Sequence, residues 1–156
     1  WTRECDCVLV KDHKFIAGLD AKSQVGPFAN TFNFCTEEAM GSALDLWTAY
    51  REGAFLDSAC PWLGYLFLLQ DCDAARRAVR TREPHFPVFQ EFKDSSYARR
   101  YELFCRKLVR ERHYTAAAFL LSPEETGPAG KYTEPASDLS VRQLLRSLLC
   151  HARAHV

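Results

Sequence analysis

The sequence lacks the features that define several large classes of protein. No apolar run approaches the roughly 20 residues that a membrane-spanning helix needs, and the longest such stretch, Trp62–Leu69, has the length of a buried strand. There is no internal repeat or low-complexity segment, and the first residues do not have the pattern of a secretory leader. The single methionine is Met40 and the chain starts at Trp1, so we expect the N-terminal part of a longer protein to be missing. The length suits a single domain over residues 1–156.

A net charge is also absent, because 20 lysines and arginines balance 20 aspartates and glutamates. The total charge therefore gives no indication of a polyanionic partner. Its distribution does, because residues 73–113 carry 11 basic and 6 acidic side chains, a net charge of +5, and the rest of the chain carries −5. Such asymmetry indicates a surface that faces a polyanion.

A disulfide framework and the usual nucleophilic sets are missing as well. Seven cysteines cannot all pair within one chain, and Cys5 and Cys7 have no second pair at zinc-ligand spacing. We therefore interpret the cysteines as reduced thiols of a cytosolic protein. No Ser-His-Asp or Cys-His set stands at persuasive spacing, and Gly26-Pro27 is not a phosphate-binding loop.

The apolar residues that are present predict an α/β domain with a mixed sheet between helices. The first two strands are expected to form a hairpin around a polar turn. The predicted strands are 5–10, 15–22, 62–69 and 115–121, and the predicted helices are 36–52, 95–112 and 139–153. The connecting segments 23–35, 71–92 and 122–135 are interpreted as loops.

Helix ends are predicted from capping residues. Thr36 is expected to cap the first helix, with Glu37 and Glu38 in its first turn and Gly53 after its end. A supporting role near a metal is the alternative for the two glutamates. Asp138 is expected to cap the last helix, whose inward side chains are predicted to be Leu144, Leu145, Leu148 and Leu149.

Three polar residues stand in the hairpin where strands normally bury apolar side chains. Asp20 and Lys22 share one face because side chains at i and i+2 point the same way, and Asp6 can face them from the first strand. Two converging carboxylates form a site for a hard divalent cation such as Mg²⁺. A lysine beside them can orient or help deprotonate a water and offset charge on phosphorus. The pattern is what metal-dependent phosphodiester hydrolysis needs, and a surface ion pair is the plain alternative.

Further residues are candidates for contact with nucleic acid. Gln24 continues the face of Asp20 and Lys22, where it is either a phosphate or water ligand or a solvated loop residue. Asn30 and Asn33 either read adenine or form turns. A cluster of loop arginines either binds phosphates and guanine or forms a solvated face. Its members are Arg76, Arg77, Arg80 and Arg82. The arginines of residues 95–112 are expected to form an exposed helix face with internal ion pairs.

Longer motifs run through nearly the whole chain. They are Lys22-Ser-Gln-Val-Gly26, Asn30-Thr-Phe-Asn33, Thr36-Glu-Glu-Ala39, Asp45-Leu-Trp-Thr-Ala-Tyr-Arg-Glu-Gly-Ala-Phe55, Arg82-Glu-Pro-His-Phe-Pro-Val-Phe89, Leu103-Phe-Cys-Arg-Lys-Leu-Val-Arg-Glu-Arg112 and Glu134-Pro-Ala-Ser-Asp-Leu-Ser140. In this order they resemble the XhoI-type family of type II restriction endonucleases.

The resemblance implies a PD-(D/E)xK nuclease with a restriction-endonuclease-like fold and Mg²⁺ as cofactor. It matches Asp6 to the family's first acidic ligand, Asp20 to the second and Lys22 to the catalytic lysine, although the family usually has glutamate where this chain has Asp20. It also implies a cytoplasmic, prokaryotic homodimer that cuts double-stranded DNA at the palindrome CTCGAG, on which a paired DNA methyltransferase also acts. A two-fold dimer suits a palindrome because each subunit meets the same half-site.

Two alternatives stay open on the sequence. One is a PD-(D/E)xK nuclease with another target or a role in repair. The other is a catalytically inactive DNA-binding protein, which would keep the basic segment but show no metal-dependent cutting. The two differ in whether the carboxylates and Lys22 are needed for function.

Overall fold

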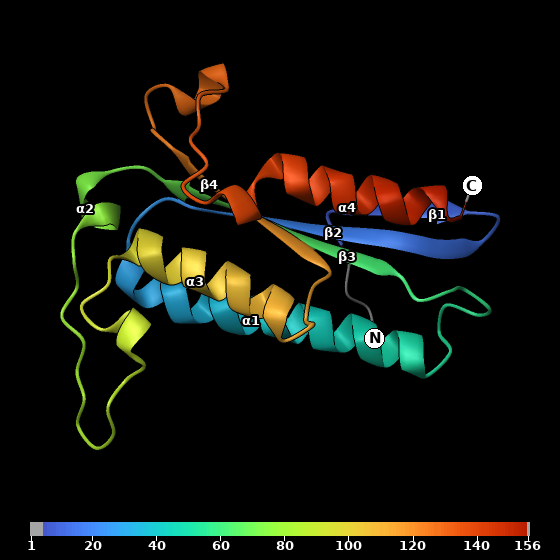
Figure 1. The fold of residues 1–156 in the computed structure, drawn as a ribbon, viewed down its shortest axis with the longest axis horizontal. Helices are drawn as coiled ribbons and strands as arrows, with labels where there is room; N and C mark the ends of the chain where they lie inside the picture. Colours follow the sequence, from blue (N-terminus) through green and yellow to red (C-terminus); the bar gives the residue numbers. More distant parts are fainter. Residues whose placement is uncertain (1–4, 156) are drawn as a thin grey trace.

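The structure is a computed structural model that describes residues 5–155, so Trp1, where the chain starts, lies outside the described residues. Four strands form one sheet in their order along the chain (Figure 1). They are β1 (Cys7–Lys11), β2 (Lys14–Gln24), β3 (Trp62–Gln70) and β4 (Ala116–Ser122). β1 and β2 are antiparallel, whereas β2, β3 and β4 are parallel. The predicted mixed sheet of an α/β domain is confirmed.

Helices cover both faces of the sheet, as Figure 1 shows. α1 (Phe28–Arg51) and α3 (Tyr97–Arg110) lie on one face, and α4 (Val141–Arg153) lies on the other. Each parallel pair of strands is joined through a helix, as a parallel connection requires. Short helical segments interrupt the loops; they are α2 (Asp73–Arg76), η1 (Gln90–Phe92), η2 (Gly127–Ala129) and η3 (Ser137–Leu139).

The core has two parts because the central strand β3 is covered on both faces. Tyr65 and Phe67 pack in the larger part with α1 and α3, whereas Trp62 and Leu66 pack in the smaller part with α4. This alternation explains why residues 62–69 are apolar almost throughout. Gly64 leaves room for the indole of Trp62, because a Cβ at position 64 would lie 2.3 Å from Trp62 Cη2.

The first helix begins earlier than the sequence predicted. Residues 28–35 were interpreted as loop, which is wrong, because α1 begins at Phe28. Phe28, Cys35 and Ala39 are buried at helical spacing, so this stretch belongs to the same inward face as the rest of the helix. Thr36 is therefore not a cap; its hydroxyl donates to the Asn33 carbonyl, 2.8 Å away, inside the helix. The predicted end is confirmed, with Gly53 at φ 78° after the last turn.

The last helix also differs from its prediction at two points. Ser140, and not Asp138, caps α4, because its hydroxyl accepts a hydrogen bond from the Gln143 amide. Asp138 lies in η3 and pairs with Arg106 instead. Leu144 is buried against the sheet as predicted, but Leu145 and Leu149 are 48% and 54% exposed. A helix turns by about 100° per residue, so the position after an inward leucine points partly outward.

No helix in residues 5–155 is both long and apolar enough to cross a membrane. All seven cysteines are free thiols. The fold therefore depends on packing and hydrogen bonds, with no covalent cross-link among the described residues.

Candidate active site

One face of β2 carries the polar residues that the sequence singled out. Asp20, Lys22 and Gln24 are at alternate positions and all find partners on α1, on α3 or just before β4. Strand geometry therefore places them in one row, as predicted. The row runs towards the carboxyl end of the sheet, where α1 begins.

Asp6 joins this row from the neighbouring chain segment. The β1–β2 pairing starts at Cys7 opposite Leu19, so the edge of β2 is open at Ala21. The Asp6 carboxylate fills that place, since its Oδ2 accepts a hydrogen bond of 2.7 Å from the Ala21 amide. Asp6 is itself exposed. The carboxylate lies beside the backbone between Asp20 and Lys22.

Asp20 lies deeper and is held by a tyrosine that the sequence analysis did not single out. The Tyr114 hydroxyl is 2.8 Å from Asp20 Oδ2 and 3.1 Å from the Ala39 carbonyl. Burial raises the pKa of the Asp20 carboxyl above its ordinary value, and the Asp6 charge raises it further. The Tyr114 hydrogen bond and the Lys22 charge oppose this rise. Asp6 and Lys22 thus have opposite effects on the pKa of the Asp20 carboxyl.

Lys22 is paired with an acid from the helix above the strand. Its Nζ lies 3.3 Å from Glu38 Oε1. Both side chains are partly shielded, with 34% and 28% of their surfaces exposed. The expectation that Glu37 and Glu38 occupy the first turn of a helix is wrong, because α1 starts ten positions before Glu38. The structure instead places Glu38 against the lysine of the candidate site.

A cavity adjoins Asp20 between the hairpin and α1. Its volume is about 600 Å³, and Cys5, Asp20 and Asp45 are among its few polar or ionisable lining residues. The Cys5 thiol lies against Asp20, and burial together with the Asp20 charge raises the pKa of the thiol to about 11. This rise favours the protonated form of the Cys5 thiol beside Asp20.

The donor set fits a hard cation held by two carboxylates. No group of three or more His, Cys, Asp or Glu side chains within residues 5–155 is arranged to hold a metal. Asp6 and Asp20 offer two carboxylates, and a cation between them would relieve the repulsion between their charges. Mg²⁺ commonly binds through one or two carboxylates and keeps several waters, so two ligands are sufficient for it.

Gln24 continues the row of Asp20 and Lys22 as predicted, but its side chain is buried. Its side chain is 3% exposed and is hydrogen bonded to the Tyr101 hydroxyl and the Pro27 carbonyl. An amide this buried reaches neither a DNA backbone nor solvent, so the interpretations of Gln24 as a phosphate ligand and as a solvated loop residue are both wrong. It joins β2 to α3 beneath the site instead.

Asn30 and Asn33 lie in the first turns of α1 and not in a loop. Both are exposed, and their spacing of three puts them on one side of the helix. They are at the end of the sheet where β2 stops. A contact with a ligand above that end is therefore sterically open to both.

The four loop arginines divide into two kinds. Arg76 is engaged by Asp71 through two hydrogen bonds of 2.5 and 2.9 Å. Arg77, Arg80 and Arg82 are exposed, and none of them forms an ion pair within residues 5–155. These three remain the cations of the loop that a polyanion can meet.

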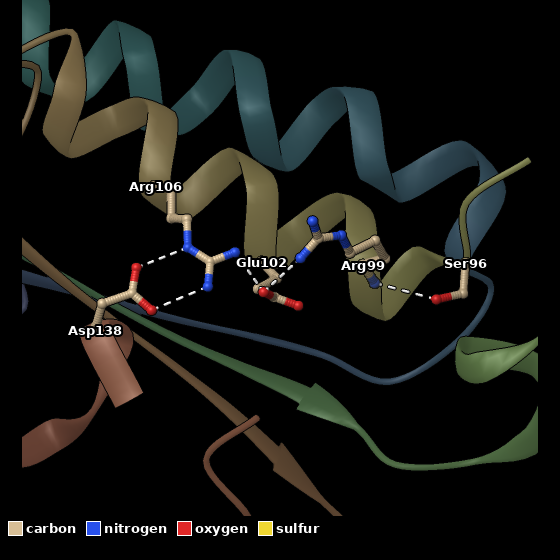
Figure 2. A network of polar contacts seen from close by, with 5 residues as sticks. All are labelled: Ser96, Arg99, Glu102, Arg106 and Asp138. Atoms are coloured by element: carbon tan, nitrogen blue, oxygen red, sulfur yellow. Dashed lines mark hydrogen bonds and ion pairs between the residues drawn. The ribbon is translucent and has the colours of Figure 1, made fainter. Parts of the chain in front are cut away.

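Arg99 and Arg106 of α3 form ion pairs on the helix as predicted, whereas Arg100 donates to the Val79 carbonyl and the Ser95 hydroxyl instead. Figure 2 shows Arg99 and Arg106 both on Glu102, with Arg106 also forming a two-point contact with Asp138 at 2.7 and 3.0 Å. The Arg106 guanidinium keeps the pKa of the Asp138 carboxyl below its ordinary value. This network joins α3 to the segment before α4 and leaves little of its charge for another partner.

Comparison with known proteins identifies the family. The family model of restriction endonuclease XhoI matches residues 1–134. The type II restriction enzyme BstVI of Geobacillus stearothermophilus is 49% identical over 156 residues, which covers 96% of this chain and 70% of that protein. The chain belongs to the XhoI family of restriction endonucleases. By this membership it is an endonuclease of the type II restriction class.

Two further members of the XhoI family have similar identity over shorter stretches. The type II restriction enzyme XhoI of Xanthomonas vasicola is 46% identical over 78% of this chain and 50% of its own length. The type II restriction enzyme AbrI of Azospirillum brasilense is 48% identical over 54% of this chain and 39% of its own length. The chain thus spans about half or less of these two relatives. No solved structure matches the chain.

Proposed function

We propose that the chain carries the catalytic core of a PD-(D/E)xK nuclease that hydrolyses duplex DNA with Mg²⁺ at the palindrome CTCGAG. The observation that supports this most is the hydrogen bond that places the Asp6 carboxylate at the Ala21 amide, between Asp20 and Lys22 on β2. Family membership supports the DNA substrate, and the palindrome follows from the family resemblance.

Each residue has a distinct part in the proposed reaction. Asp6 and Asp20 would hold Mg²⁺, which supplies charge stabilisation at a phosphate oxygen and a more acidic water. The Lys22 ammonium orients the attacking water and offsets negative charge on phosphorus. The water oxygen forms a bond to phosphorus and gives up a proton to solvent, while the opposite P–O bond of the backbone breaks and the leaving oxygen takes up a proton from solvent. No covalent enzyme intermediate is needed.

Glu38 acts as a positioning residue in this proposal. Its ion pair with Lys22 restricts an otherwise long and flexible side chain to the row that contains Asp20. Tyr114 does the same for Asp20 by approaching one of its two carboxylate oxygens. The site is thereby fixed before substrate arrives, which is the arrangement that lowers the cost of reaching a transition state.

We also propose a homodimer, with a DNA methyltransferase acting on the same site. A palindrome presents identical half-sites, and two copies related by a two-fold axis each meet one of them. Cutting of both strands then needs one site per subunit.

The test uses the natural full-length form of the protein and a plasmid with one CTCGAG site. We expect a single linear product with Mg²⁺, none with EDTA, and a loss of at least about 100-fold in rate for Lys22→Ala. Lys14→Ala is the matched control, because Lys14 lies on the same strand but pairs with Asp57. Binding of DNA without any metal-dependent cutting would instead identify an inactive DNA-binding protein. Cutting at another sequence would support the nuclease activity but refute the proposed specificity for CTCGAG.

A further inference from the structure

The loop between α2 and η1 presents an aromatic side chain to solvent at its tip. Phe86 is 84% exposed, the highest exposure given for any large apolar side chain in residues 5–155. It has no ring contact within the described residues, whereas the Lys107 ammonium lies 5.3 Å from the ring centre of Phe89. Figure 1 shows this loop extending away from the sheet and helices. Phe86 is therefore not part of the core of this chain.

The tip is held in shape although it makes no contact with the core. The Glu83 carboxylate accepts a hydrogen bond from the Val88 amide at 3.1 Å and pairs with Lys93 at 3.3 Å. Pro84 and Pro87 flank His85 and Phe86 and fix their own φ angles. The aromatic ring is thus presented by a closed, preorganised turn.

The base of the loop is tied to the rest of the domain. Thr81 and Asp94 exchange two hydrogen bonds, of 3.3 and 3.1 Å, and the Val79 amide bonds the Ser95 carbonyl at 3.3 Å. Ser95 immediately precedes the cap of α3. The loop therefore keeps a defined place relative to the domain.

That place is the end of the sheet that carries the candidate site. α3 begins beside α1, where the rings of Tyr97 and Phe28 stack at 5.8 Å. The Gly26 amide, just after β2, bonds Gln70 at the end of β3. The loop, the start of α1 and the end of the Asp20 and Lys22 row thus all lie at the carboxyl end of the parallel strands.

The surroundings of the tip are basic. Residues 77–89 carry three arginines and one glutamate, and that glutamate is used within the turn. Arg80 and Arg82 line an open hollow of about 750 Å³ formed by residues 79–84. Guanidinium groups in such a hollow match phosphate oxygens in geometry and charge.

We propose that Phe86 is a wedge that enters the base stack of bound duplex DNA while Arg80 and Arg82 hold the adjacent phosphates. This inference rests on the proposed function, because it takes duplex DNA as the ligand. Apolar side chains that insert between base steps partly unstack and kink the duplex, and the extra contacts offset the cost. A preformed tip with proline on both sides avoids the loss of loop entropy on insertion.

The test measures base unstacking directly in the natural full-length protein. Duplexes containing CTCGAG carry 2-aminopurine at the adenine of the site or at the first or second position outside it, and Ca²⁺ replaces Mg²⁺ to prevent cutting. We expect wild type to raise the fluorescence at one of these positions. Phe86→Ala should abolish that rise and weaken binding about 10- to 100-fold, and Phe86→Leu should retain part of both. Leu149→Ala, an exposed apolar residue on α4, is the matched control.

Salt dependence separates the wedge from the phosphate contacts. Phe86→Ala should leave the slope of log affinity against log salt unchanged, whereas Arg82→Ala should reduce its magnitude by about 1. An unchanged fluorescence rise in Phe86→Ala, or a changed oligomeric state with normal unstacking, would overturn the proposal.

Plasmid cutting by wild type, measured in parallel, separates this proposal from the proposed function. Cutting with no unstacking at any labelled position overturns only the wedge. Unstacking without cutting supports the wedge and refutes the catalytic proposal. The absence of DNA binding overturns both.

Discussion

Glu38 and its neighbour Glu37 lie on different sides of α1, because each residue of a helix is rotated by about 100° from the one before. Glu37 is exposed, whereas Glu38 reaches the Lys22 ammonium at 3.3 Å. The two glutamates have the same chemistry and differ in the direction in which the helix points them. This difference makes the role of Glu38 testable with a control next to it.

We expect Glu38→Gln to lower the turnover number for DNA cutting by about 10- to 100-fold with little change in KM, because misplacing a catalytic group by about 1 Å can cost that much. Steady-state cutting of a short duplex measures both constants. Glu38→Asp should recover part of the rate, and Glu37→Gln should behave as wild type. An equal loss in both glutamine variants would contradict a positioning role.

Substitution of phenylalanine for two buried tyrosines is expected to change the free energy of unfolding in opposite directions. The Tyr65 hydroxyl has no hydrogen-bond partner in the described residues, whereas the Tyr114 hydroxyl approaches Asp20 and the Ala39 carbonyl. Removing an unsatisfied buried hydroxyl removes a desolvation cost. Tyr65→Phe should therefore raise the free energy of unfolding by about 1 kcal/mol, and Tyr114→Phe should lower it by about 1–2 kcal/mol. Urea denaturation of both variants measures the difference, and a loss of stability in Tyr65→Phe would contradict the prediction.

At the scale of whole elements, the strands were easier to predict than the start of the first helix. The run at 62–69 and the polar turn between the first two strands are strong local signals, and β1, β2 and β3 lie where these signals place them. Two asparagines and Gly26-Pro27 indicated a loop up to residue 35. Tertiary packing overrode that preference, because Phe28 and Phe32 bury against the rings of Tyr97 and Tyr101 on α3.

At the candidate site too, local sequence patterns predicted the strand residues but not the residues brought in by tertiary packing. Alternation along β2 was sufficient to place Asp20 and Lys22 on one face. A supporting role near the metal was only the alternative for Glu38, and Tyr114 was not identified, because both reach the site through the packing of α1 and of the segment before β4, and no spacing in the sequence encodes that. The spacing of Phe28, Cys35 and Ala39 was the available signal that α1 begins at Phe28, which places Glu38 inside the helix and not in its first turn.

The contact between α4 and the hairpin predicts a pH dependence of stability. His151 on α4 bonds the Ile16 carbonyl on β2 at 3.1 Å, and burial together with His155 lowers its pKa below the ordinary value. A base with a lower pKa in the folded protein binds fewer protons folded than unfolded, so stability falls as pH drops from about 7 to 5.

We expect His151→Gln to flatten this fall in the free energy of unfolding between pH 7.5 and 5.5, because glutamine can keep a hydrogen bond without titrating. Urea denaturation at the two pH values measures it, with His13→Gln in the exposed hairpin turn as the control. A steeper fall of the free energy of unfolding in His151→Gln would refute the prediction, because it would mean that His151 stabilises the folded protein at low pH.

Across the whole molecule, charge is divided between arginines with and without internal partners. The sequence balance of 20 basic and 20 acidic residues conceals this division. Arg99 and Arg106 are held by acids on and beside α3, as Figure 2 shows, whereas Arg77, Arg80 and Arg82 are exposed on the loop. Counting arginines in the basic segment therefore overstates the number available to DNA.

Arg80→Ala should weaken binding to any duplex and reduce the magnitude of the salt slope by about 1, because each lost phosphate contact releases about one counterion fewer. Arg99→Ala is the control, since its guanidinium is already engaged by Glu102. Fluorescence anisotropy at several salt concentrations gives both slopes. Equal salt slopes for Arg80→Ala and Arg99→Ala would show that internal ion pairing does not decide which arginines contact DNA.

The hydroxyl of Tyr114 links residues that are 94 positions apart in the chain. A ribosome has therefore released Asp6, Asp20 and Lys22 long before the group that holds Asp20 in place has been made. Until Tyr114 and the strand after it have emerged, a nascent chain has the acidic and basic groups without the arrangement that the finished domain gives them. The order of synthesis thus delays the assembly of the proposed cutting site until most of the chain is complete, so a partly made chain does not yet have the arrangement that we propose for cutting.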